Sequence, residues 1–134
     1  MLAPTRYFHN AAASISYHPA GYVQLDWQPT VVSSQELRAI YEHLLRAMKY
    51  FEASSLMTTH NQRPPMPQDV QQWLVETWVP QAIAEVNYAR CAIVEAEKPL
   101  SRLAARTVGG SLMQPLTYAY FTSVDEATVW LTAN

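Results

Sequence analysis

The sequence predicts an α/β sandwich in which a mixed sheet of about four to five strands is covered by about four helices. Residues 14–27, SISYHPAGYVQLDW, alternate apolar and polar side chains around a turn, as a β-hairpin does. After residue 34, segments with helical spacing alternate with short apolar runs. Strands separated by helices pair in parallel through right-handed crossovers, so the hairpin is expected to supply the antiparallel part of the sheet.

A hairpin and a capped helix are predicted first. The apolar positions of the hairpin are Ile15, Tyr17, Val23, Leu25 and Trp27, with HPAG as the turn. The segment TRYFH is expected to form a further short strand ahead of it. Ser33 and Glu36 fit a capping box, because a hydroxyl and a carboxylate satisfy free amide groups at a helix start. The apolar stripe that follows predicts a helix over about 34–51.

The middle of the chain predicts a strand, a loop and a helix interrupted by proline. SSLMT is a short candidate strand, and TTHNQRPPMP (58–67) is a connection stiffened by three prolines. Pro67 suits the first turn of the next helix, and Asp69 complements the helix dipole there. Pro80 is expected to break or kink this helix, which then continues through Ile83 and Val86.

The last third of the chain predicts two more strands and two more helices. YARCAIVEA has the nearly continuous apolar character of a strand buried on both faces, and LTYAYFT is the last strand. Between them, PLSRLAARTV reads as a short helix that ends at Gly109 and Gly110. Ser123 and Glu126 form a second capping box in front of a final amphipathic helix.

Composition excludes several classes of function. The 134 residues fit one domain, and no second domain or internal repeat is apparent. Nine basic side chains face eleven acidic ones, so nothing favours nucleic acid as a partner. There is no secretory signal pattern and no apolar run of the roughly 20 residues that span a bilayer, so we expect a cytoplasmic protein without membrane insertion.

The residue patterns do not favour catalysis, a metal or a cofactor. The four histidines are spread along the chain without metal-ligand spacing, and the three glycines make no phosphate-binding loop. Cys91, the single cysteine, stands in the apolar run CAIV, where a small buried thiol is the ordinary occupant. We therefore expect a protein with no catalytic activity, no cofactor and no metal site.

Several segments together resemble the small bacterial STAS-like proteins. These are YHPAGYVQLDW, SSQELRAIYEHLL, DVQQWLVETWVPQA, YARCAIVEA and FTSVDEATVWL, over roughly residues 14–133. The most specific pieces are Trp27, the pair Trp73 and Leu74, and the stretch Ser123 to Leu131. That group is related to the anti-sigma-factor antagonists, and its fold is often compared with lipid-binding CRAL-TRIO domains. The resemblance implies a STAS-like sandwich.

The resemblance also implies action through protein contacts. Anti-sigma-factor antagonists bind a partner protein and are switched by phosphorylation of a Ser or Thr at a helix start after the third strand. The nearest matching hydroxyls here are Thr58 and Thr59. Trp73 and Trp78 lie five positions apart, about 140° around a helix, so one ring is expected at an interface when the other is buried. The first hypothesis is thus a non-catalytic protein-binding module that forms a homodimer, its partner protein unknown.

The alternative hypothesis is binding of a small apolar or anionic ligand near residues 58–67. His60, Asn61 and Arg63 form the one local set that could bind an anion, at the sheet edge where α/β proteins hold ligands. An apolar ligand could draw on a large aromatic supply: Tyr17, Trp27, Trp73, Trp78, Tyr118, Tyr120 and Trp130. A cavity between the sheet and the helices would favour this hypothesis.

Overall fold

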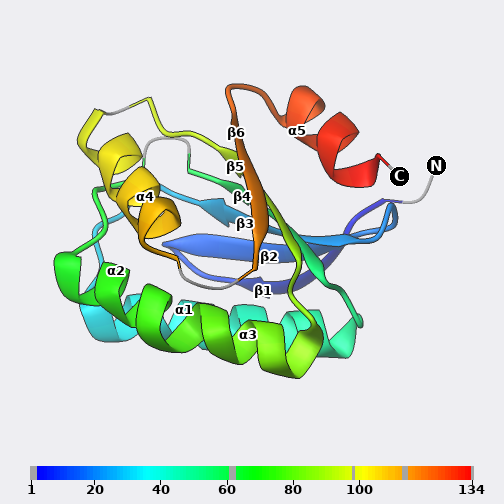
Figure 1. Cartoon of the computed structure of the whole chain (residues 1–134), viewed down its shortest axis with the longest axis horizontal. Coiled ribbons are helices and arrows are strands. Elements are labelled where there is room, and N and C mark those ends of the chain that lie inside the picture. Colours follow the sequence, from blue (N-terminus) through cyan, green and yellow to red (C-terminus); the bar gives the residue numbers. More distant parts are fainter. Residues whose placement is uncertain (1–2, 61–62, 98, 113–114, 134) are drawn as a thin grey trace.

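A computed structural model describes residues 3–60, 63–97, 99–112 and 115–133. Within these ranges six strands form one mixed sheet in sequence order (Figure 1). The strands are β1 (Thr5–His9), β2 (Ala13–His18), β3 (Tyr22–Trp27), β4 (Ser55–Thr59), β5 (Arg90–Val94) and β6 (Thr117–Phe121). β1, β2 and β3 pair antiparallel, and β3 to β6 pair parallel. The predicted α/β fold with an N-terminal hairpin is confirmed.

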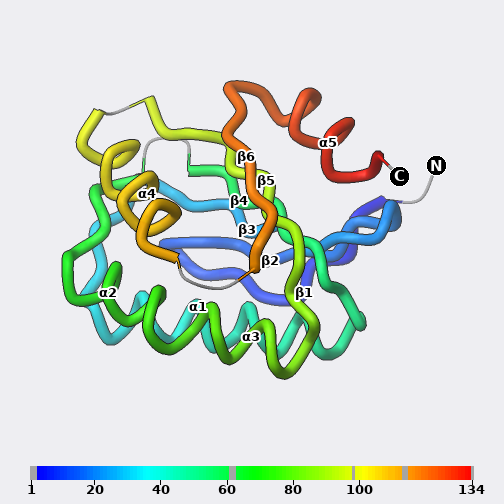
Figure 2. Tube along the Cα trace, in the orientation of Figure 1, coloured from blue at the N-terminus to red at the C-terminus, as the bar shows by residue number. Residues whose placement is uncertain are grey.

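The helices lie on both faces of this sheet (Figures 1 and 2). They are α1 (Ser34–Tyr50), α2 (Gln68–Trp73), the π-helical turn η1 (Leu74–Trp78), α3 (Val79–Val86), α4 (Pro99–Ser111) and α5 (Val124–Thr132). Each parallel crossover moves one strand along the sheet in the same direction, so right-handed connections place α1, α2, α3 and α4 on one face. α5 follows the last strand and packs on β4, β5 and β6 from the other face.

Alternation along the strands divides the interior into two cores. On the face of α1 and α3, Leu25 and Leu56 pack with Ile40 and Leu44 in the larger core. On the α5 face, the smaller core contains Tyr22, Met57, Ala92, Ala127 and Leu131. Neighbouring residues of β4 therefore belong to different environments, since successive side chains of a strand point to opposite faces.

The serine half of each predicted capping box is present at its helix start. The Ser33 hydroxyl accepts a hydrogen bond from the Glu36 amide at 3.1 Å, and the Ser123 hydroxyl accepts one from the Glu126 amide at 3.2 Å. TRYFH is a strand, β1, and it brings the sheet to six strands in the described part of the chain instead of the four to five expected.

The helix does not break at Pro80, and it continues through Ile83 and Val86 as expected. The helix continues from α2 through η1 into α3, and the Val79 amide donates to the carbonyl of Leu74, five residues back. Proline lacks an amide hydrogen and its ring clashes with the carbonyl four residues earlier. The wider π turn in front of Pro80 absorbs that misfit, because it shifts the hydrogen-bond pattern by one residue.

The expected helix end at Gly109 and Gly110 is wrong, because α4 continues to Ser111. Gly109 serves close packing instead. A Cβ atom at this position would lie 2.5 Å from the Tyr120 hydroxyl and 3.1 Å from the Tyr118 ring. The absence of a side chain thus lets the helix backbone approach two tyrosines of β6.

Candidate functional site

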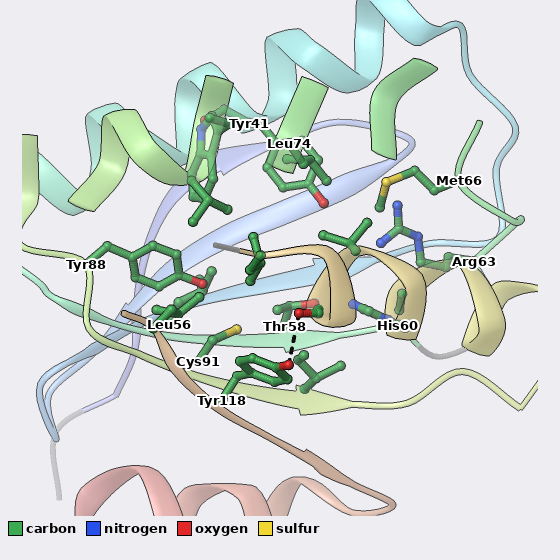
Figure 3. A pocket seen from close by; sticks show the side chains of 18 residues that line it. Tyr41, Leu56, Thr58, His60, Arg63, Met66, Leu74, Tyr88, Cys91 and Tyr118 are labelled. Atoms are coloured by element: carbon green, nitrogen blue, oxygen red, sulfur yellow. Dashed lines mark hydrogen bonds between the residues drawn. The ribbon is translucent and has the colours of Figure 1, made fainter. Parts of the chain in front are cut away.

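A cavity lies between the parallel strands and the helices α1, α3 and α4 (Figure 3). The strands contribute Leu56, Cys91 and Tyr118, while η1 contributes Leu74 and Trp78. The centre of a water-sized sphere can move through about 90 Å³ of this space. Most of the lining is apolar, so the cavity is suited to an apolar or partly apolar occupant.

α4 leaves room for the cavity because it packs mainly against other helices. Its neighbours are α2 and η1, and it reaches the sheet through the tyrosines of β6. The Tyr118 hydroxyl donates to the Gly109 carbonyl at 2.9 Å, the bond drawn as a dashed line in Figure 3. Ala105 and Val108 of α4 line the space with small side chains. The helix therefore forms a roof over the cavity.

Three polar side chains are gathered at one side of the cavity: Thr58, His60 and Arg63 (Figure 3). The strand period brings Leu56, Thr58 and then His60 to the cavity face of the sheet. The Arg63 amide donates to the His60 carbonyl at 2.8 Å, which holds these two residues close together. The Ser101 hydroxyl donates to the Arg63 carbonyl at 2.7 Å and ties Arg63 to α4.

All three side chains are almost fully buried. The exposed fractions are 8% for Thr58, 5% for His60 and 4% for Arg63. Thr58 Oγ1 and His60 Nδ1 have no hydrogen-bond partner among the described residues. A buried polar atom without a partner costs about 1–3 kcal/mol, so natural proteins rarely leave two beside one cavity.

Arg63 places a positive charge in the same wall. Its Cζ lies 4.1 Å from the centroid of the Trp27 ring, a cation–π arrangement. Burial lowers the pKa of Arg63 from its ordinary value, while the nearby Tyr41 hydroxyl opposes this shift. None of the ion pairs of the described chain includes Arg63.

Burial controls protonation around the cavity. It lowers the pKa of His60 well below 6.5, and the charge of Arg63 adds to this effect, so the imidazole is neutral at pH 7. Burial raises the pKa of Cys91 to about 12, which leaves a protonated thiol of low reactivity. The pKa of Tyr88 is raised well above 10.0 for the same reason. The cavity can bind and orient a molecule, and it contains no thiolate or charged imidazole at neutral pH.

The structure brings together only part of the predicted loop site. Thr58, His60 and Arg63 share the cavity wall, but Thr58 and Thr59 belong to strand β4 and not to the loop. Thr59 points to the opposite face, where its hydroxyl donates to Asp26 Oδ1 at 2.5 Å. Asn61 lies outside the described residues.

The two tryptophans predicted for an interface have different positions. Trp78 is 2% exposed and its indole Nε1 donates to the Tyr41 carbonyl at 2.8 Å. Its ring belongs to the core and lines the cavity, so Trp78 offers no surface for a partner. Trp73 is partly buried against the same core. Leu74 and Trp78 lie four positions apart, so both are on the inward face of the helix, as regular helical spacing also predicts.

For several residues of the cavity, no local pattern in the sequence indicates a binding site. Tyr41 stands among the buried apolar positions of α1, and Tyr88 and Cys91 stand in the apolar segment YARCAIVEA. Cys91 is buried as expected, yet it also lines the cavity. The contribution of these residues depends on how α4 packs over the sheet, which no local pattern encodes.

No group of three or more His, Cys, Asp and Glu side chains in the described ranges is arranged as a metal site. No helix within these ranges combines the length and the apolar character that crossing a membrane requires.

Comparison of the chain with protein-family models, with curated proteins and with solved structures finds no match.

Proposed function

We propose that this protein is a non-catalytic module that binds a small, largely apolar molecule in the cavity beneath α4. The observation that carries the proposal is the pair of unpartnered buried atoms, Thr58 Oγ1 and His60 Nδ1, in the wall of an otherwise apolar space. A ligand with one polar group would satisfy them. Binding of a small ligand is thus preferred to the first hypothesis, a homodimeric protein-binding module.

The position of the cavity supports the proposal. Thr58 stands near the carboxyl end of β4 and His60 directly follows it, where parallel α/β sheets commonly hold ligands. The wall also includes the π turn η1 through Leu74 and Trp78. π turns are destabilising and occur frequently at functional sites.

The test compares two variants of α4. Ala105→Phe would fill the cavity, whereas the matched Leu103→Phe changes a side chain on the outer face of the same helix, which is 62% exposed. A panel of small aromatic and branched compounds is screened by thermal stabilisation and isothermal titration calorimetry. We expect one or more compounds to stabilise the wild type and Leu103→Phe, but not Ala105→Phe.

Two results would contradict the proposal. One is that no compound of the panel binds the wild type and that native mass spectrometry of the protein from its own source shows no bound mass. The other is that a compound binds wild type and a folded Ala105→Phe equally, because its site would then lie elsewhere.

A second candidate is a homodimeric protein-binding module of the STAS-like kind. Leu100 and Leu103 favour it, since they lie one turn apart on α4 and are 68% and 62% exposed. Exposed apolar pairs of this sort are common at interfaces between identical subunits. A phosphorylation switch at Thr58 would require β4 to open, because that hydroxyl is buried. Thr59 is bonded to Asp26, whose carboxylate would repel a phosphate.

Light scattering coupled to size-exclusion chromatography tests this second candidate. A dimer would become a monomer in the double variant Leu100→Ser and Leu103→Ser with the fold retained. A monomeric wild type would count against self-association through α4.

A further inference from the structure

We infer that the ligand is a small monocarboxylic acid with a compact aromatic or branched body, whose carboxylate binds Arg63 while its body lies against Tyr88, Cys91 and Leu56. This inference rests on the proposed function and specifies its ligand. Figure 3 shows the arrangement behind it, with Thr58, His60 and Arg63 at one side of the cavity and Tyr88, Leu56 and Cys91 at the other.

Arg63 is a buried cation without a counter-ion. All eleven Asp and Glu side chains of the chain belong to the described residues, and none forms an ion pair with Arg63. The ring of Trp27 and the hydroxyl of Tyr41 compensate only part of the lost hydration. Buried charges in proteins are normally paired, so the missing partner is expected to be an anion from outside the chain.

The other polar groups indicate a carboxylate. A guanidinium presents a planar fork that matches the two oxygens of a carboxylate. The Thr58 hydroxyl can donate a further hydrogen bond, and a neutral His60 can donate through one ring nitrogen. Among the described residues of the lining, Arg63 is the one charged side chain, since the burial that lowers the pKa of His60 keeps it neutral. A single positive charge balances a monoanion and leaves a phosphate dianion undercompensated.

The size of the cavity limits the body of the ligand. One water-sized group needs about 10–15 Å³ of such centre-accessible space, so 90 Å³ holds on the order of six to nine groups. That number fits a benzoate-sized acid and excludes a long fatty acid in this conformation. The rings of Tyr41, Trp78 and Tyr88 surround the space, which favours an aromatic body.

The first experiment uses the wild-type chain and pairs of probes. Benzoate is compared with benzamide, which has nearly the same shape without the charge, by isothermal titration calorimetry. Phenyl phosphate at pH 8 tests a dianionic head, and dodecanoate tests a long chain. We expect benzoate to bind at least about tenfold more tightly than benzamide and than either other probe.

The second experiment uses one arginine variant and a matched control. Arg63→Met removes the charge and keeps an apolar side chain, whereas Arg38→Met removes an arginine that pairs with Asp69 at 3.1 Å on the surface. The ratio of the dissociation constant of benzamide to that of benzoate should fall to about one in Arg63→Met and should be unchanged in Arg38→Met. Thr58→Val is a second cavity variant, expected to weaken benzoate binding with little change for benzamide.

The outcomes separate this inference from the proposed function. If benzamide or phenyl phosphate binds as tightly as benzoate, the inference of a monocarboxylate ligand is wrong. The proposed ligand-binding function would still hold if Ala105→Phe abolishes that binding. If dodecanoate binds more tightly than benzoate, the compact body is wrong. If none of these probes and no member of the screening panel binds the wild type, the proposed function fails as well.

Discussion

Two arginines of this protein each lie over a tryptophan ring, one at the α5 side of the sheet and one at the cavity. The Cζ of Arg90 is 4.4 Å from the centroid of Trp130, and the Cζ of Arg63 is 4.1 Å from that of Trp27. Arg90 also donates to the carbonyls of Trp130 and Ala133, at 2.9 and 3.1 Å. Arg63 hydrogen-bonds to no carbonyl or carboxylate of the described residues, although it is the more deeply buried of the two.

Two neighbouring threonines repeat this contrast. Thr59 faces α5 and donates to Asp26, which also accepts from the side-chain amide of Gln24 at 2.9 Å. Thr58 faces the cavity, and its hydroxyl has no partner among the described residues. Residues of the same type thus have hydrogen-bond partners on the α5 face of the sheet and lack them on the cavity face.

Under the proposed function, this contrast separates structural polar groups from groups that bind the ligand. Polar side chains that only stabilise a fold are bonded within it, because an unpaired buried group lowers stability. Groups that bind a ligand must keep their bonding capacity free until the ligand arrives. The unpaired polar groups of the cavity face are therefore expected to lower the free energy of unfolding, a cost that binding sites commonly carry.

The largest expected effect is a difference in sign between the two arginines. Arg90→Met should lower the free energy of unfolding by about 1–3 kcal/mol, because the hydrogen bonds of a charged donor are lost. Arg63→Met should leave it unchanged or raise it by about 1–4 kcal/mol, because an uncompensated buried charge is removed. Urea unfolding followed by tryptophan fluorescence measures both variants.

The contrary result is a strong loss of stability in Arg63→Met comparable to that of Arg90→Met. Arg63 would then be a structural residue that the fold satisfies, and the comparison between the faces would fail. Equal slopes of the unfolding free energy against urea are the control that both variants unfold from the same native state.

The two threonines should show the same pattern with a smaller difference. Thr59→Val removes the bond to Asp26 and should cost about 1–2 kcal/mol of unfolding free energy. Thr58→Val keeps the shape and removes an unpaired hydroxyl, so stability should be unchanged or up to about 1 kcal/mol higher. The same urea titration measures both, and a larger loss for Thr58→Val would contradict the assignment of its hydroxyl to a ligand.

Much of the fold follows from local patterns in the sequence. The alternation around HPAG predicts β2 and β3, and the two capping boxes predict the starts of α1 and α5, because these signals depend on neighbouring residues alone. The passage of the helix through Pro80 without a break was not predictable in this way. It depends on a π turn that tertiary packing stabilises, and propensity is a weak guide where packing decides.

The candidate site was predictable only in part. The local set of His60 and Arg63 pointed to the end of β4 beside the cavity, because α/β proteins commonly hold ligands at the carboxyl ends of parallel strands. The same reading treated Thr58 and Thr59 as equivalent, although the strand period separates them. The rest of the lining, with Tyr41, Tyr88 and Tyr118, is assembled from distant segments, so no spacing in the sequence indicates it.

The smallest expected effect is the pH dependence that His60 adds to stability. Burial first, and the charge of Arg63 second, lower the pKa of His60 well below the 6.5 of an exposed histidine. Between these two pKa values the unfolded chain binds a proton that the folded chain does not, so stability falls as the pH drops below 6.5. The loss attributable to His60 is at most about 1.4 kcal/mol per pH unit.

His60→Gln should remove this contribution while the other three histidines titrate as before. Urea unfolding of both proteins from pH 7.5 to 5.5 gives the unfolding free energy as a function of pH. Above pH 6.5 the two curves should differ only by a constant. Below pH 6.5 the wild type should lose more stability than the variant. Parallel curves over the whole range would mean that the imidazole can take up a proton in the folded state. His60 would then have water or an acceptor at its side, and it could not belong to the unpartnered groups that distinguish the cavity face from the α5 face.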